Sequence, residues 1–275
     1  ERIRSALANE EFELFAQPII DFEGRERPMY EVFLRMRASD GSLIAPGAFL
    51  PVAERHDLIQ SIDAWVFSEA ITMLAERGGP DAEFGVCVNL TGRSVGDPRP
   101  VDLISSRPRE TGADPSRLVF EVTETSAIGN IAQAQDFATT LAEFGCRFAL
   151  DDFGTGESSL SQLSTLPVDR VKIDKSFVMP SSADSDALRL LESIVGVCRT
   201  IGMPIVAEGV EDEAAVANLS DMGVDLAQGY FFFRPLPASE VEASVLARIP
   251  DQRTSRENSR RDHDDHDNVI YTKFG

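Results

Sequence analysis

Short apolar runs alternate along this chain with longer amphipathic stretches, and this alternation constrains the fold more than any other feature. The runs predict eight strands, at residues 14–20, 30–35, 85–90, 118–123, 147–153, 170–173, 204–210 and 227–232. Apolar residues recur every three or four positions in the stretches between several of these runs, the period of a one-sided helix. This period predicts helices at residues 62–75, 131–144, 187–200 and 213–222.

Alternating strands and helices favour an α/β fold with a mostly parallel sheet. Eight strands in 275 residues favour a TIM-type (β/α)8 barrel, and a doubly wound open sheet is the alternative. Only residues 21–29 separate the first two predicted strands, which is too short for a crossover helix. We therefore expect an antiparallel first strand pair and an irregular barrel.

The two ends of the chain differ from its middle. Residues 1–10 predict a short helix, which we expect to be a linker from a preceding domain because the chain begins at Glu1 rather than Met. Residues 11–249 form the expected barrel. Residues 250–275 are charged and poor in apolar side chains, which predicts a flexible tail. His263 and His266 lie in this tail, where disorder is favoured over a metal site.

Charge and cysteine content limit the partners. The formal net charge is −20, which disfavours binding to DNA or RNA duplexes but leaves a small phosphorylated ligand open, since bound metals can reverse the local field. The three cysteines lie in apolar contexts without metal-ligand spacing, which predicts reduced, buried thiols of a cytoplasmic protein. No apolar run approaches the roughly 20 residues that span a bilayer.

One apolar run ends in two adjacent carboxylates, Asp151 and Asp152, and a glycine-containing loop follows directly. Neighbouring carboxylates repel each other unless a positive charge lies between them. A pair of divalent cations is the usual source of that charge. The segment therefore favours a metal-dependent enzyme over a binding module.

Polar residues recur at the ends of the other predicted strands, and the C-terminal strand ends of a TIM barrel share one active-site mouth. The set is Glu31, Arg35, Asn89, Glu121, Glu124, Asp151, Asp152, Lys172, Asp174, Glu208, Glu211 and Gln228. Singly, several of these could be surface ion pairs or turn caps. Glu121, Lys172 and Glu208, however, are flanked by apolar strand residues, where a charge needs a partner.

Oxygen ligands without paired histidines or cysteines indicate magnesium or manganese rather than zinc. Two such ions can clamp a phosphodiester and activate water between them. Beside two cations, Lys172 should have a depressed pKa, and it could orient or deprotonate the attacking water. A Schiff-base lysine is the less attractive alternative, given the surrounding carboxylates.

These residues fall into ordered motifs, and from about residue 12 to residue 237 the chain resembles the EAL-domain phosphodiesterases that hydrolyse cyclic di-GMP. The motifs are Gln17-Pro18-Ile19, Tyr30-Glu31-Val32-Phe33-Leu34-Arg35, Val88-Asn89-Leu90-Thr91, Glu121-Val122-Thr123-Glu124, Asp151-Asp152-Phe153-Gly154-Thr155-Gly156, Val171-Lys172-Ile173-Asp174, Ala207-Glu208-Gly209-Val210-Glu211 and Gln228-Gly229-Tyr230.

The resemblance implies a role for each matched residue. One metal would be held by Glu31, Asn89, Glu121 and Asp151, and the second by Asp151, Asp152 and Glu208. The implied catalytic set is Lys172, which positions or activates water, Glu124, which steadies the loop after the fifth strand, Glu208 and Glu211. The implied substrate contacts are Arg35, Gln228, Leu34 and Asp174. The implied reaction opens cyclic di-GMP to linear pGpG by in-line attack of water.

Two departures from the family pattern stand out. The namesake Glu-Ala-Leu is here Glu31-Val32-Phe33, which keeps the metal-binding glutamate. Glu157 stands where the family usually has tyrosine, and its charge could weaken activity. A catalytically silent cyclic di-GMP receptor is therefore the alternative function, followed by a protein-interaction module without ligand.

The resemblance also implies partners and a location. We expect a homodimer and a preceding diguanylate cyclase-like or sensory domain. We expect a cytoplasmic location in a bacterium, with membrane attachment of the full-length protein left open.

Overall fold

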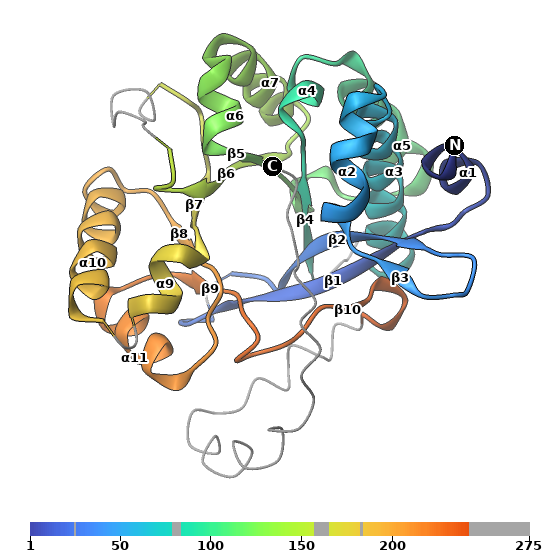
Figure 1. The fold of residues 1–275 in the computed structure, drawn as a ribbon. Helices are drawn as coiled ribbons and strands as arrows, with labels where there is room; N and C mark the ends of the chain where they lie inside the picture. Colours follow the sequence, from blue (N-terminus) through green and yellow to red (C-terminus); the bar gives the residue numbers. More distant parts are fainter. Residues whose placement is uncertain (25, 79–83, 157–164, 182–183, 242–275) are drawn as a thin grey trace.

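Eight strands close into one barrel in the computed structural model, which describes residues 1–24, 26–78, 84–156, 165–181 and 184–241 (Figure 1). Around the barrel the order is β1 (Phe12–Asp21), β9 (Leu226–Ala227), β8 (Ile205–Ala207), β7 (Arg170–Ile173), β6 (Arg147–Phe153), β5 (Leu118–Thr123), β4 (Gly85–Asn89) and β2 (Met29–Arg37). β1 pairs with β2 to close the ring. Two short strands, β3 (Leu43–Ile44) and β10 (Leu236–Pro237), pair with β2 and β1.

β1 runs antiparallel to both of its barrel neighbours, while every other neighbouring pair within the barrel is parallel. The short connection between β1 and β2 has no room for a crossover helix and makes them a hairpin. The prediction of an irregular TIM-type barrel with an antiparallel first pair is confirmed, and the open sheet is excluded.

Helices cover the outside of the barrel (Figure 1). They are α1 (Arg2–Ala8), α2 (Pro46–Arg55), α3 (Ile59–Gly78), α4 (Gly92–Val95), α5 (Pro98–Thr111), α6 (Glu124–Gly129), α7 (Ile131–Glu143), α9 (Lys175–Ser181), α10 (Ser185–Thr200) and α11 (Glu213–Met222), with 3-10 turns η2 (Pro115–Arg117) and η3 (Ala238–Glu240). All four helices predicted from the apolar period are confirmed. The predicted N-terminal helix is α1, and its Ile3 and Ala6 pack into the main core.

The main core lies between the strands and the helices. Phe120 of β5 packs edge-on against Phe67 of α3 and Phe137 of α7, with ring centroids 5.2 and 6.4 Å apart. The three cysteines are buried free thiols, as predicted. In the part of the chain that the structure describes, no helix combines the length and the apolar character needed to cross a bilayer.

A second, smaller core fills the inside of the barrel and supports the site. It consists of one apolar side chain from each of seven strands: Ile19, Met29, Cys87, Val119, Ala149, Val206 and Leu226. Side chains alternate between the two faces of a strand, so the residue two positions away points inward again. That position is polar and lies in each of the seven strands or directly after it. These residues are Gln17, Glu31, Asn89, Glu121, Asp151, Glu208 and Gln228. A polar layer therefore lies on the apolar one, at the carboxyl ends of the parallel strands.

The last two predicted strands are shorter than expected. β8 ends at Ala207, and Gly209 then adopts a φ of 67°, which turns the chain out of the strand. β9 ends at Ala227 because the next residues form a turn, in which the backbone N–H groups of Phe232 and Phe233 donate to the Gly229 carbonyl. The aromatic residues after Gly229 resemble a strand in sequence but belong to this turn. The predicted tail at 250–275 lies outside the described residues.

Gly229 permits the close contact between this turn and the end of β8. A Cβ atom at Gly229 would lie 2.0 Å from the carbonyl oxygen of Val210, whereas a Cβ at Gly196 of α10 would meet nothing within 4 Å. We predict that Gly229→Ala lowers the free energy of unfolding by about 3 kcal/mol or more, because backbone atoms must move. Gly196→Ala should raise it by up to about 1 kcal/mol through helix propensity. Urea unfolding of both variants measures this, and equal stabilities would contradict the packing described.

Candidate metal centre

A lysine lies at the centre of the polar layer. Lys172 Nζ is 2.9 Å from Glu31 Oε2, 2.6 Å from Glu121 Oε2 and 2.8 Å from Glu208 Oε1. Asp151 Oδ1 is 3.5 Å away. The lysine and its partners are buried, and each comes from a different strand or strand end. Predicted site residues that lie up to 177 positions apart in the sequence therefore converge on one ammonium group.

The charge of Lys172 follows from this arrangement. Burial disfavours the ammonium form, but the four carboxylates (Asp151, Glu121, Glu208 and Glu31) outweigh burial and raise the pKa of Lys172 well above its ordinary value. The sequence led us to expect a depressed pKa beside two cations. The direction in this structure is opposite, because the nearest charges to the lysine are carboxylates.

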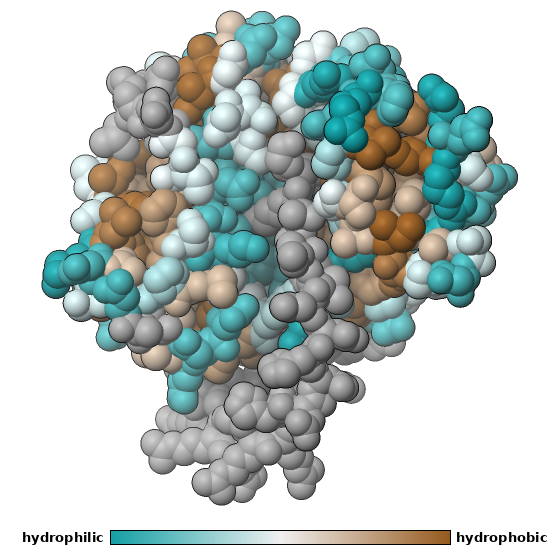
Figure 2. Space-filling view, viewed as in Figure 1, coloured by the Kyte–Doolittle hydropathy of each residue, from teal (hydrophilic) through white to brown (hydrophobic). Residues whose placement is uncertain are grey.

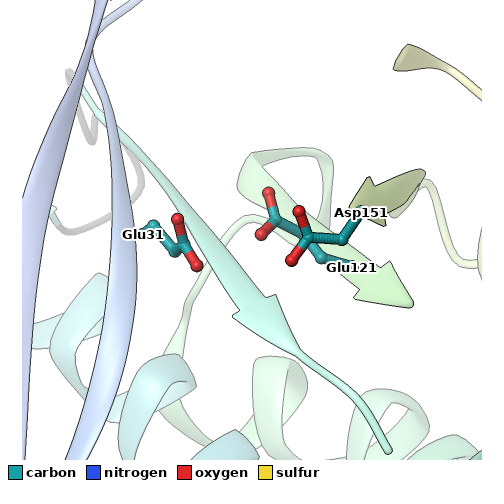
Figure 3. A group of neighbouring side chains, drawn as sticks. All are labelled: Glu31, Glu121 and Asp151. Carbon is teal, nitrogen blue, oxygen red and sulfur yellow. The ribbon is translucent and has the colours of Figure 1, made fainter. Parts of the chain in front are cut away.

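The same carboxylates form two groups that could each hold a metal ion. Glu31, Glu121 and Asp151 form one group, and Figure 3 shows their carboxylates gathered from three strands. Asp151, Asp152 and Glu208 form the other, and in each group the ligand atoms lie within 4.8 Å of one another. All of the donors are hard oxygens, so the site fits magnesium, manganese or calcium better than zinc.

Asn89 lies beside the first group. Its Nδ2 donates a hydrogen bond of 2.7 Å to Glu31 Oε1, which fixes the amide against the carboxylate. The side chain is 3% exposed. Asn89 is therefore in contact with a residue of the first group, and its role as a ligand stays a prediction.

A β-bulge brings two consecutive aspartates to the same site. In a regular strand Asp151 and Asp152 would point to opposite faces. The register of β6 with β7 shifts between Leu150 and Phe153, and Asp152 adopts a φ of 52°, in the left-handed region that aspartate tolerates better than most residues. Both carboxylates consequently reach the second metal group.

Glu124 supports the loop that follows this bulge. It begins α6, it is 2% exposed, and its Oε2 accepts a 2.8 Å hydrogen bond from the backbone N–H of Gly154. Thr155 Oγ1 donates to the carbonyl of Asp152 at 2.7 Å. The predicted role of Glu124, to steady the loop after the fifth barrel strand, matches this contact. Glu157, the departure from the family pattern, lies outside the described residues.

Arg35 and Gln228 lie on the side of the mouth formed by β1, β2 and the end of β9. Arg35 is buried, its Nη1 donates to the Leu34 carbonyl at 2.8 Å, and its guanidinium lies 5.5 Å from the centroid of the Phe15 ring. Gln228 Nε2 donates to Gln17 Oε1 at 3.2 Å, and Gln17 Nε2 donates to the carbonyl of Phe233 at 2.7 Å. The sequence placed Gln17 in a family motif but assigned it no role. In the structure its hydrogen bond orients Gln228.

The remaining predicted site residues are Leu34, Asp174 and Glu211. Leu34 lies on the opposite face of β2 from Glu31 and packs in the main core, and its contact with substrate stays a prediction; Phe33 shares the face of Glu31. Asp174 accepts a 3.0 Å hydrogen bond from the backbone N–H of Ser176 at the start of α9. Glu211 is exposed in the segment between β8 and α11.

On the face of the molecule that Figure 2 shows, hydrophilic residues gather beside the grey atoms, between flanks where hydrophobic residues reach the surface. A polar mouth of this kind suits a charged ligand better than an apolar one. The formal charge of the chain, −20, makes metal ions the simplest way to admit an anionic ligand here.

Comparisons with known proteins agree on one family. A family model described as EAL domain matches residues 1–235. The cyclic di-GMP phosphodiesterase PdeF of Escherichia coli K12 is 36% identical over 237 residues, which is 86% of this chain and 31% of that protein. The chain spans about a third of the length of the curated relatives it matches.

Solved structures of the same family share the fold. The PaMucR phosphodiesterase in complex with c-di-GMP aligns with a TM-score of 0.79 at 34% identity, over 86% of this chain and 96% of that one. The FimX EAL domain of Pseudomonas aeruginosa bound to c-di-GMP aligns with a TM-score of 0.80 at 28% identity, over 85% and 94%.

The contacts of Lys172 predict its contribution to stability in the absence of metal. Lys172→Met leaves buried carboxylates without their cation and should lower the free energy of unfolding in EDTA by about 3–5 kcal/mol. Lys175→Met, at an exposed position, is the matched control and should change it by no more than about 0.5 kcal/mol. Denaturant unfolding monitored by circular dichroism measures both. A Lys172→Met protein as stable as the control would contradict the described arrangement.

Proposed function

Because the chain belongs to the EAL domain family, we propose that it hydrolyses cyclic di-GMP to linear pGpG with two divalent cations, Mg²⁺ or Mn²⁺. The convergence of the matched acidic residues and Lys172 on one buried point carries this proposal. The names of relatives support it, since PdeF of E. coli and PdeB of Shewanella oneidensis are both cyclic di-GMP phosphodiesterases.

The proposal assigns the metal ligands by their grouping. Glu31, Asn89, Glu121 and Asp151 would hold one ion, and Asp151, Asp152 and Glu208 would hold the other. When bound, such ions polarise the phosphodiester and lower the pKa of coordinated water. Asp151 belongs to both groups, so it would connect the two ions.

Lys172 would act on the attacking water. Its ammonium group is held by three contacts shorter than 3 Å, which fix its position before substrate arrives. A lysine held in this way can orient water for in-line attack at low entropic cost. Glu208 contacts Lys172 directly, and Glu124 holds the loop beside the second metal group.

Arg35 and Gln228 would bind the substrate. Arg35 offers a permanent positive charge for a phosphate, and its contacts with Leu34 and Phe15 fix the guanidinium at the mouth. Gln228 is 4% exposed and oriented by Gln17, so its amide is preorganised for a hydrogen bond. Asp174 and Glu211 keep their implied roles near the substrate and the metal-water network as parts of this proposal.

The proposal extends to the whole protein. A preceding diguanylate cyclase-like or sensory domain is consistent with the name of the bifunctional diguanylate cyclase/cyclic di-GMP phosphodiesterase MucR. It is also consistent with relatives about three times as long as this chain. A homodimer and a cytoplasmic location remain part of the proposal.

Hydrolysis of the purified chain's substrate tests the function. With Mg²⁺ or Mn²⁺, chromatography should show cyclic di-GMP converted to pGpG, and EDTA should stop the reaction. Asp151→Asn should abolish turnover, because it removes a charge from both metal groups. No hydrolysis by the wild-type chain, with cyclic di-GMP binding shown by calorimetry, would favour the silent receptor instead.

Lys172→Ala separates binding from chemistry in the same assay. We predict a fall in kcat of about 10²–10⁴, the usual range for a proton-transfer or water-orienting group, with cyclic di-GMP affinity kept. Lys175→Ala at an exposed position is the control. Unchanged kcat in the Lys172 variant would remove this lysine from the mechanism.

A further inference from the structure

A buried aspartate on α3 lies outside the acidic groups described above. Asp63 is 0% exposed, and its Oδ2 accepts hydrogen bonds from Thr91 Oγ1 at 2.6 Å, Ser94 Oγ at 2.6 Å and the Thr91 backbone N–H at 3.3 Å. Burial raises the pKa of Asp63 to about 6, against the lowering effect of the bonds from Ser94 and Thr91. A buried carboxylate costs free energy, so its contacts indicate a purpose beyond filling space.

The two donors of Thr91 lie in the turn that leads from β4 into α4, and the third, from Ser94, lies in α4 itself. This turn starts directly after Asn89, whose Nδ2 bonds to Glu31 at 2.7 Å. On the barrel side, the backbone N–H of Leu90 donates to the Glu121 carbonyl at 2.8 Å. On the outer side, Asp63 holds Thr91, the next residue. The backbone that carries Asn89 is therefore fixed between β5 and α3.

Thr91 is used differently from an ordinary helix cap. It precedes α4, where a threonine side chain commonly accepts a hydrogen bond from the first turn. Here the Thr91 hydroxyl accepts no hydrogen bond from the backbone of the helix; it donates to Asp63 at 2.6 Å and lies 3.3 Å from Ser94 Oγ. Ser94, within α4, also donates to Asp63. One carboxylate of α3 thus holds this four-residue helix through Thr91 and Ser94, beside a 3.3 Å hydrogen bond from Gln60 Nε2 to the Arg93 carbonyl.

We propose that Asp63 is a positioning residue for the metal centre, which holds the β4–α4 turn through Thr91 and Ser94 so that Asn89 presents its side-chain oxygen to the cation. The proposal rests on the metal site proposed above. Residues that orient metal ligands from behind commonly contribute 10- to 100-fold to metal affinity. Asp63 acts through hydroxyl and backbone groups and has no described contact with the carboxylates of either metal group.

Manganese binding, measured by calorimetry, tests this role without an activity readout. Asp63→Ala should weaken Mn²⁺ affinity by about tenfold or more, and Asp63→Asn, which keeps an acceptor for the hydroxyls, should restore part of the loss. Val195→Ala, in a buried position of α10 away from the site, controls for general destabilisation and should keep the affinity of the wild type. If Asp63→Ala does not fold, Asp63→Asn should show a smaller loss of the same kind.

A double-mutant cycle with Asn89→Ala tests whether Asp63 affects Mn²⁺ binding through Asn89. If Asp63 acts through Asn89, Asp63→Asn should weaken Mn²⁺ binding in the wild-type background and have little further effect in the Asn89→Ala background. Unchanged affinity, or an equal loss in both backgrounds, would overturn the proposal. If Asp151→Asn binds Mn²⁺ as tightly as the wild-type chain, the proposed metal site itself is refuted. This result distinguishes a failure of the metal site from a failure of the role of Asp63.

Discussion

The mutual repulsion of buried carboxylates is the constraint on which this structure depends. Glu31, Glu121, Asp151 and Glu208 lie close together inside a barrel, where water cannot screen their charges. Lys172 lies between them and contacts all four. The strands must therefore place carboxylates and an ammonium group at the same height inside the barrel. The proposed cations would bind among the same carboxylates as the lysine.

The barrel places these charges at one height because side chains alternate between the two faces of a strand, with a period of two residues. Six polar residues of the site follow an apolar residue of the inner core by two positions, as Glu121 follows Val119 and Asp151 follows Ala149. Lys172 follows the buried Arg170 by the same spacing. The apolar layer closes the barrel below and sets the height of the polar layer above it. Asp152 is the exception, because it needs the bulge and a left-handed backbone to reach the same site. Regular strands thus build most of the centre, and one irregularity completes it.

Sequence reasoning found the barrel and the central group because both depend on local pattern. A glutamate such as Glu121, between apolar strand residues, has few explanations other than a buried site. It failed where tertiary packing decides the outcome. The end of β9, for example, depends on the contact between Gly229 and Val210. A single aspartate in a predicted helix is usually exposed, so nothing in the sequence indicated that Asp63 is buried and bonded to Thr91 and Ser94.

The anomalous scattering of a crystal grown with Mn²⁺ would locate the metal ions themselves. We expect two anomalous peaks at the mouth of the barrel. One should be bound by Glu31, Asn89, Glu121 and Asp151, and the other by Asp151, Asp152 and Glu208. Peaks only at other places, or none at these carboxylates under conditions where Mn²⁺ supports turnover, would contradict the proposed metal site.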